Sequence, residues 1–244
     1  MTGALYTRYE LVRAFRNRRF FFFSLGFPLV LYFLIAGPQS SDDNFAGTGI
    51  SAALFYMAGL LSFGTMSSMI STGGRIAGER QAGWTRQLRI TPLSAHAYFR
   101  AKLVTSYGMA ILTIAALYIA GAILGVSLPA GKWLEMTGLI LIALLPFAAL
   151  GIALGHLLNV DSIGPAMGGL TALLALVGGT WFPVTQGFLH DVGQCLPSYW
   201  LAQAGHLGTG GAPWGATGWL VTAAWTIALT ILARYAYRRD TGRV

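Results

Sequence analysis

Six long stretches of this chain contain almost no charged side chains, and this feature constrains the fold more than any other. Only 10% of the 244 residues are charged, whereas soluble domains carry about 25%. A helix needs about 20 residues to cross the roughly 30 Å hydrocarbon core of a bilayer, and each stretch is close to that length. The predicted membrane spans are residues 20–37, 50–72, 103–128, 133–158, 163–181 and 215–233.

The spans are predicted to be helices, because lipid offers no hydrogen-bond partner to a backbone group and open sheet edges cannot exist there. A β-barrel would show alternating apolar and polar residues, whereas these stretches are continuously apolar. The expected fold class is therefore all-α: a single polytopic membrane domain, residues 1–244, with six transmembrane helices.

The basic residues predict the orientation of the chain. With six spans, both termini lie on one side of the membrane, together with the loops 73–102 and 159–162. Every one of the 16 basic residues except Lys132 falls on that side, so the positive-inside rule places both termini in the cytoplasm. The net charge of +8 is therefore a topology signal, and no soluble basic face is left for nucleic acid. Fourteen arginines against two lysines indicate a bacterial, GC-rich source, and hence the inner membrane.

Two segments outside the spans are also expected to be helical. Leu5, Tyr9, Val12 and Arg16 share one helical face, which fits a short interfacial helix among cytoplasmic headgroups; a basic anchor that only orients the first span is the alternative. The external segment 182–214 is too apolar for an ordinary loop. Its stripe of Phe188, Leu189, Val192 and Leu196 predicts short re-entrant helices, which are tolerated where protein covers the backbone.

Several kinds of chemistry are missing from the sequence. The one Gly-Lys pair, Gly131-Lys132, is followed by Trp133 and lies on the outer side, so no phosphate-binding P-loop is present. The carboxylates lie in loops or at span ends, which disfavours ion coupling through a buried acid. No G-x-S-x-G elbow, H-E-x-x-H motif or cysteine–histidine cluster is visible. The chain is therefore expected to have no catalytic residue, metal or cofactor of its own.

The residues leave two classes of function open, an enzyme and a non-catalytic membrane protein. His156 and Asp161 have the H-x4-D spacing of glycerolipid acyltransferases, in which the aspartate orients a histidine base. The simpler interpretation is a partnered or snorkelling histidine, with Asn159 and Asp161 forming the turn and Asp161 capping the next helix. A non-catalytic membrane assembly factor is the other class of function that remains open.

A polar segment interrupts the apolar pattern between the second and third spans. Trp84 and Leu88 are four residues apart and share a helical face. Thr91-Pro92 should stop that helix, and Ser94 is placed to cap the next one. The pattern predicts a rigid elbow, residues 78–94, that exposes apolar anchors among charges, as a docking surface does. Arginines alone would explain the topology of the segment, but not its Trp, Leu, Gly and Pro residues.

This elbow resembles the cytoplasmic-loop signature of ABC-2 type transporter permeases, most closely those of the drug- and antibiotic-export branch. The matching residues are Glu79, Arg80, Gly83, Trp84, Thr85, Leu88, Thr91, Pro92, Leu93 and Ser94. A second region is similar to the external Phe-Pro…Leu-Pro segment of that family: Gly178, Gly179, Trp181, Phe182, Pro183, Leu196 and Pro197. Trp84 departs from the family pattern, in which a smaller residue is commoner.

The resemblance implies a complete transport cycle with partners. The elbow would couple the spans to a separate ABC ATP-binding subunit, present in two copies, that binds ATP and magnesium. A second permease copy, as a homodimer, or a sister permease would complete the pathway among membrane lipids. Phe182, Pro183, Leu196 and Pro197 would belong to an external gate. The cargo would be a hydrophobic or amphipathic small molecule or a lipid, exported across the inner membrane.

Overall fold

The computed structural model describes residues 3–39, 50–84, 87, 90–91, 93–182, 186–207 and 214–241, without the side chains of residues 19, 20, 23 and 241. These parts contain helices and no strands, so the all-α prediction is confirmed for them. Five helical stretches are long and apolar enough to cross a membrane. They are Ala52–Gln81, Ala95–Ile123, Ala130–Leu157, Val160–Val177 and Ala216–Asp240.

The first predicted span is less regular than the others. It consists of α2 (Arg18–Phe21), the π-helical η1 (Phe22–Gly26) and α3 (Phe27–Ala36), and its apolar helical part, Ser24–Ala36, is shorter than the other five. Pro28 cannot donate a backbone hydrogen bond. In a regular helix the amide of residue 28 would donate to the Ser24 carbonyl, and Pro28 has no such amide. The Thr113 hydroxyl on α7 (Ala95–Ile123) donates to this carbonyl instead, at 3.2 Å, so a neighbouring helix satisfies the backbone oxygen.

The second span continues well past its predicted end. Helix α4 (Ala52–Ile70) runs into α5 (Thr72–Gln81), and α7 (Ala95–Ile123) starts before the predicted third span. Ser94 caps α7 by accepting a hydrogen bond from the Ala97 amide, which confirms the predicted cap. Much of the predicted loop 73–102 is therefore helix that packs on the bundle.

The remaining helices surround α4, which is buried along nearly its whole length. The fourth span is divided near Pro146 into α8 (Ala130–Ala143) and α9 (Leu145–Leu157). Helix α10 (Val160–Val177) and helix α13 (Ala216–Thr241) are the least buried of the spans. Two short helices, α11 (Phe188–Gln194) and α12 (Pro197–His206), lie in the segment 182–214, for which short helices were predicted.

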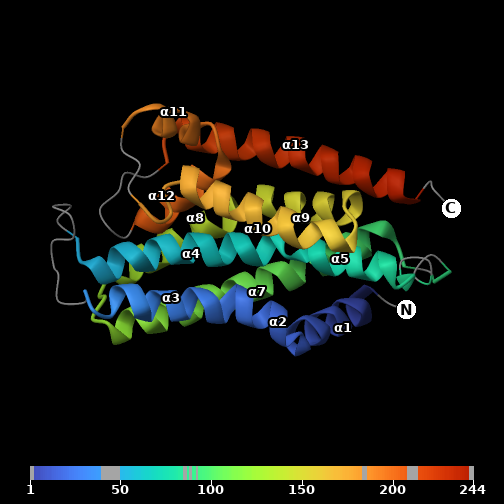
Figure 1. Ribbon diagram of the computed structural model, residues 1–244, viewed down its shortest axis with the longest axis horizontal. Coiled ribbons are helices and arrows are strands. Elements are labelled where there is room, and N and C mark those ends of the chain that lie inside the picture. Colours follow the sequence, from blue (N-terminus) through green and yellow to red (C-terminus); the bar gives the residue numbers. More distant parts are fainter. Residues whose placement is uncertain are drawn as a thin grey trace.

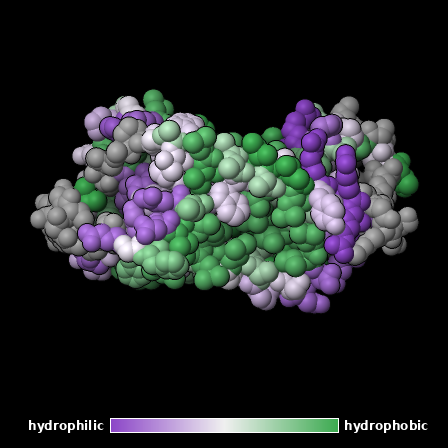
Figure 2. Space-filling view, turned by 90° about the horizontal axis from the view of Figure 1, so that it is seen from above, coloured by the Kyte–Doolittle hydropathy of each residue, from purple (hydrophilic) through white to green (hydrophobic). Residues whose placement is uncertain are grey.

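The molecule is elongated, with two different ends (Figure 1). Helix α1 (Gly3–Arg16), the end of α5 and both termini lie at one end, and α11 lies at the other. A belt of apolar side chains separates two hydrophilic regions, as a membrane protein requires (Figure 2).

Candidate functional site

The elbow begins where α5 ends, and a glycine determines that end. Gly83 has a φ of +71°, a left-handed conformation that glycine adopts without steric cost. Its amide bonds to the Arg80 carbonyl at 3.1 Å, closing the last turn of α5. Trp84 follows and is 36% exposed, whereas Leu93 packs against the buried Tyr98 and Ala101. Three predicted elbow residues, Thr85, Leu88 and Pro92, lie outside the described residues.

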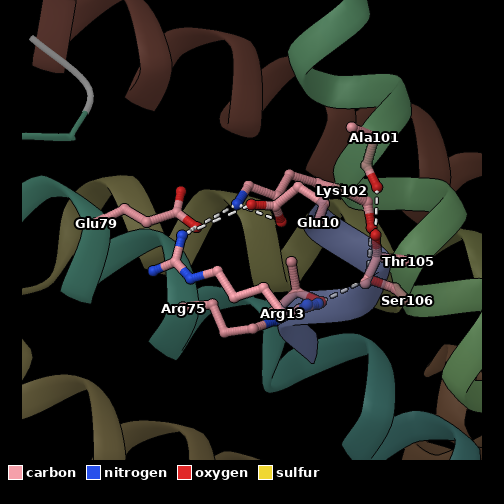
Figure 3. A network of polar contacts seen from close by, with 9 residues as sticks. Glu10, Arg13, Arg75, Glu79, Ala101, Lys102, Thr105 and Ser106 are labelled. Atoms are coloured by element: carbon pink, nitrogen blue, oxygen red, sulfur yellow. Dashed lines mark hydrogen bonds and ion pairs between the residues drawn. The ribbon is translucent and has the colours of Figure 1, made fainter. Parts of the chain in front are cut away.

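The acidic residue of the signature is buried in an ion cluster. The Lys102 ammonium lies 2.5 Å from Glu79 Oε1 and 2.9 Å from Glu10 Oε2, and all three side chains are at most 4% exposed (Figure 3). Glu10 is on α1, Glu79 on α5 and Lys102 on α7. Because a buried charge is costly unless it is paired, this contact holds the three helices in one arrangement.

Two arginines extend the cluster. Arg13 on α1 donates to Glu79 Oε1 at 3.0 Å, and Arg75 on α5 donates to the Thr72 hydroxyl at 3.0 Å. The Thr72 hydroxyl is in turn 2.5 Å from the Ser106 hydroxyl on α7. We call Glu10, Arg13, Arg75, Glu79 and Lys102 the acid–base cluster (Figure 3).

The basic residue of the signature points to other helices. Arg80 forms a 2.8 Å ion pair with Asp240 near the end of α13. It also donates to the carbonyls of Gly155 and Leu158, at 3.1 and 3.0 Å, and so satisfies backbone groups at the end of α9. Adjacent residues of a helix point about 100° apart, so Glu79 and Arg80 connect α5 to different neighbours. Glu79 contacts α1 and α7, and Arg80 contacts α9 and α13.

Aromatic side chains lie between these two sets of contacts. The Tyr98 ring stacks on Tyr6 and on Tyr237, at 6.3 Å between centroids in both cases, and the Lys102 ammonium is 5.3 Å from its centroid. Burial, together with the charges of Glu10 and Glu79, raises the pKa of Tyr6 well above its ordinary value. Its hydroxyl therefore stays neutral beside the carboxylates.

The predicted acyltransferase pair is not brought together as a dyad. His156 Nδ1 is hydrogen-bonded to Asp240 Oδ2 at 3.0 Å, which confirms the partnered-histidine interpretation. Asp161 is exposed in the first turn of α10. The prediction that Asp161 caps this helix is wrong: the helix begins two residues earlier than an Asp161 cap would give, so its N-cap is Asn159. Within the described residues, no group of three His, Cys, Asp or Glu side chains could hold a metal ion.

Two of the four residues predicted for an external gate, Leu196 and Pro197, form the start of α12. Leu196 is extended and precedes Pro197, the first residue of α12, as proline at a helix start requires. The Ser62 hydroxyl on α4 donates to the Leu201 carbonyl at 3.1 Å, and Trp225 on α13 donates to the Cys195 carbonyl at 2.8 Å. Phe182 is 65% exposed, and Pro183 lies outside the described residues.

Sequence reasoning found Glu79 and Arg80 but missed their partners. Glu10 and Asp240 each stand alone among arginines near one terminus, and Lys102 is one of two lysines. An isolated acid within a basic segment was the available signal. This signal does not indicate which basic residue pairs with the acid. Lys102, for example, is 92 residues away from Glu10 in the sequence.

Comparisons with known proteins indicate the family to which the chain belongs. Residues 40–235 match the family described as ABC-2 family transporter protein. The chain is also 32% identical over 240 residues to a Bacillus subtilis (strain 168) protein named "Putative transport permease YvfS", and the alignment covers 95% of each protein. Together with its apolar helices, these matches make the chain a multi-pass membrane protein. It belongs to the ABC-2 family of transporter proteins, as the resemblance of its elbow predicted.

Proposed function

We propose that this chain is the permease subunit of an ABC exporter and that a separate ATP-binding subunit docks on its elbow. The observation that carries the proposal is the placement of Glu79 and Arg80. These two consecutive residues, at the start of the elbow, contact four helices: α1 and α7 through Glu79, and α9 and α13 through Arg80. A displacement of the elbow would therefore move most of that end of the bundle.

A groove beside the elbow has the shape and chemistry of a docking site. It has a volume of about 800 Å³ and lies between α1 and the elbow. Tyr9 and Trp84 provide exposed aromatic surface, and Arg13, Arg16 and Gln87 provide a polar rim. Apolar anchors surrounded by a polar rim are typical of protein interfaces. In this proposal Trp84 and the flanking Thr85, Leu88, Thr91, Pro92 and Leu93 form the contact, and the buried Glu79 and the half-buried Arg80 transmit it.

The rest of the transport machinery follows from this assignment. The shorter helix Ser24–Ala36 acts as a sixth span, which places both termini and the elbow in the cytoplasm of a bacterial cell. ATP and magnesium bind to two copies of the ATP-binding subunit. A second copy of this chain, or a sister permease, completes the pathway. Phe182, Pro183, Leu196 and Pro197 belong to the outer gate, and the cargo is hydrophobic or amphipathic.

The test is copurification followed by assays of coupling. The tagged chain is purified from host membranes in mild detergent, and a P-loop ATPase subunit is expected to copurify. Vesicles containing the complex should move the amphipathic dye Hoechst 33342 in an ATP-dependent manner. Trp84→Ala should weaken binding of the ATPase at least tenfold, because buried tryptophans are frequent interface hot spots.

The matched control is Phe188→Ala, which removes another exposed aromatic ring from α11, at the opposite end of the molecule. It should leave ATPase binding unchanged. Folded Trp84→Ala protein that retains the ATPase as well as the parent would contradict docking on the elbow. Absence of any P-loop ATPase from the purified complex would contradict the proposed function as a whole.

A further inference from the structure

A second groove lies between α1 and α7, next to the proposed docking groove. It has a volume of about 630 Å³. Leu11, Val12 and Phe15 from α1 and Val104 from α7 give it an apolar lining. Arg8 and Arg100 are the charged residues of that lining, and no carboxylate contributes to it.

The apolar part of the groove continues onto a surface of α7 that faces away from the bundle. Arg100 precedes Val104 by one helical turn, and Ile111 lies on the same face about two turns beyond Val104. Val104 and Ile111 are 42% and 52% exposed, and Ile119 further along α7 is 63% exposed. These exposed aliphatic residues belong to a predicted membrane span. The groove is therefore the end of a surface that lies at the depth of lipid acyl chains.

The charged end of the groove attracts anions. Among the described residues, the ion pairs involve neither Arg8 nor Arg100. The Arg100 guanidinium lies against Gly3, at the beginning of α1. If Gly3 carried a Cβ, that atom would be 3.1 Å from Arg100 Nη2. The first turn of α1 adds the partial positive charge of a helix N-terminus to the two guanidinium groups. Glu10, the acidic residue of α1, is turned away and paired with Lys102.

We propose that this groove binds one anionic phospholipid. Its phosphate lies between Arg8 and Arg100, and one acyl chain lies along Leu11, Phe15 and Val104. Two arginines with no acid among the lining residues favour a net negative headgroup over a zwitterionic one. The continuous apolar surface of α7 favours a lipid over a soluble partner, because a soluble subunit cannot follow that surface into the membrane. The bound lipid would hold α1 against α7 independently of the ATP-binding subunit.

The test is lipid binding to the purified full-length chain, measured by native mass spectrometry. The probes are dioleoyl phosphatidylglycerol, dioleoyl phosphatidylcholine and free glycerol 3-phosphate. Phosphatidylglycerol should bind with at least tenfold preference over phosphatidylcholine, and glycerol 3-phosphate should not compete at equal concentration. An arginine near an anionic headgroup contributes about fivefold to affinity, so Arg8→Gln with Arg100→Gln should weaken phosphatidylglycerol binding about thirtyfold.

Two further variants separate the site from general positive charge and from misfolding. Arg18→Gln removes a basic residue from the same end of the chain but outside the groove lining, and it should bind the lipid like the parent. Arg8→Lys with Arg100→Lys keeps the charge and should bind within about threefold of the parent.

Three results would overturn the proposal. The first is equal binding of the two lipids, or an equal loss in Arg18→Gln, which would indicate diffuse electrostatic attraction. The second is competition by glycerol 3-phosphate at the same concentration, which would indicate an anion site without a role for the apolar groove. The third is a disulfide between two copies of Val12→Cys in a Cys195→Ser background, which would show that a second copy of this chain occupies the groove.

Discussion

At the scale of single residues, the most demanding feature is the ammonium of Lys102. It is fully buried between the carboxylates of Glu10 and Glu79, close to the end of a membrane span. Removing one partner from such a contact leaves a charge that neither water nor another group compensates, whereas replacing every member by apolar groups can be nearly neutral. The acid–base cluster therefore specifies how α1, α5 and α7 fit together more than it adds stability.

Lys102→Met is expected to lower the stability of the purified protein strongly. The loss of one partner from a buried pair costs about 3–5 kcal/mol, which corresponds to a fall in the midpoint of thermal unfolding of roughly 10 °C in a protein of this size. The measurement is intrinsic tryptophan fluorescence during heating in detergent.

The chain supplies its own control for this substitution. Lys132 forms a similar 3.1 Å pair with Glu135, but both side chains are more than 40% exposed. Lys132→Met should therefore cost less than about 1 kcal/mol. Equal effects of the two substitutions would show that burial of the cluster does not determine its energetic role.

At the scale of helices, close packing depends on particular glycines. A Cβ on Gly73 of α5 would lie 2.6 Å from the Gly151 carbonyl oxygen of α9, and one on Gly155 would lie 2.8 Å from the Gly73 carbonyl oxygen. Small residues allow two membrane helices to approach this closely. Gly164 and Gly168 have the same GxxxG spacing as Gly151 and Gly155, but a Cβ on either would meet nothing within 4 Å.

Gly73→Ala should separate α5 from α9 and reduce stability by about 1–3 kcal/mol, because the neighbouring atom is backbone and cannot rotate away. Gly164→Ala places the same methyl group on α10 in open space and should leave stability unchanged or slightly higher. The midpoints of thermal unfolding of the two variants test this. A larger loss in Gly164→Ala than in Gly73→Ala would contradict the packing of α5 on α9.

At the scale of the whole molecule, the two ends are held together by different contacts. One end gathers the ion pairs and hydrogen bonds that join α5 to α1, α7, α9 and α13, beside the elbow. The other end gathers α11 and α12, which tryptophan–carbonyl hydrogen bonds join to each other, to Trp214 and to α13. In the proposed orientation, the first end receives force from the ATP-binding subunit and the second controls release.

The single cysteine allows a direct test of this orientation. Cys195 is exposed between α11 and α12. A membrane-impermeant maleimide should label it in right-side-out vesicles. In a Cys195→Ser background, Gln87→Cys in the exposed elbow should react only in inverted vesicles. Labelling of Gln87→Cys from the outside would reverse the proposed topology.

The sequence predicted much of the fold, but its accuracy differed between features. Continuous apolarity located five spans, because each depends on residues that are adjacent in the chain. It did not reveal that α4 continues through α5 to Gln81. Polar residues can extend a helix beyond the membrane, so the end of an apolar stretch is not the end of a helix. Gly83 was the better signal, since its left-handed conformation closes the last turn of α5.

The sequence by itself determined that this chain is a helical membrane protein of the ABC-2 family, because hydropathy and the elbow signature are properties of contiguous residues. Only the tertiary structure decided what Glu79 and Arg80 contact. Glu79 meets Lys102 and, through it, Glu10, whereas Arg80 meets Asp240. These partners come from three separate segments, and their meeting depends on how each helix is rotated and packed. Contacts between segments that are distant in the sequence set the rotation of each helix, so a local sequence pattern does not determine it.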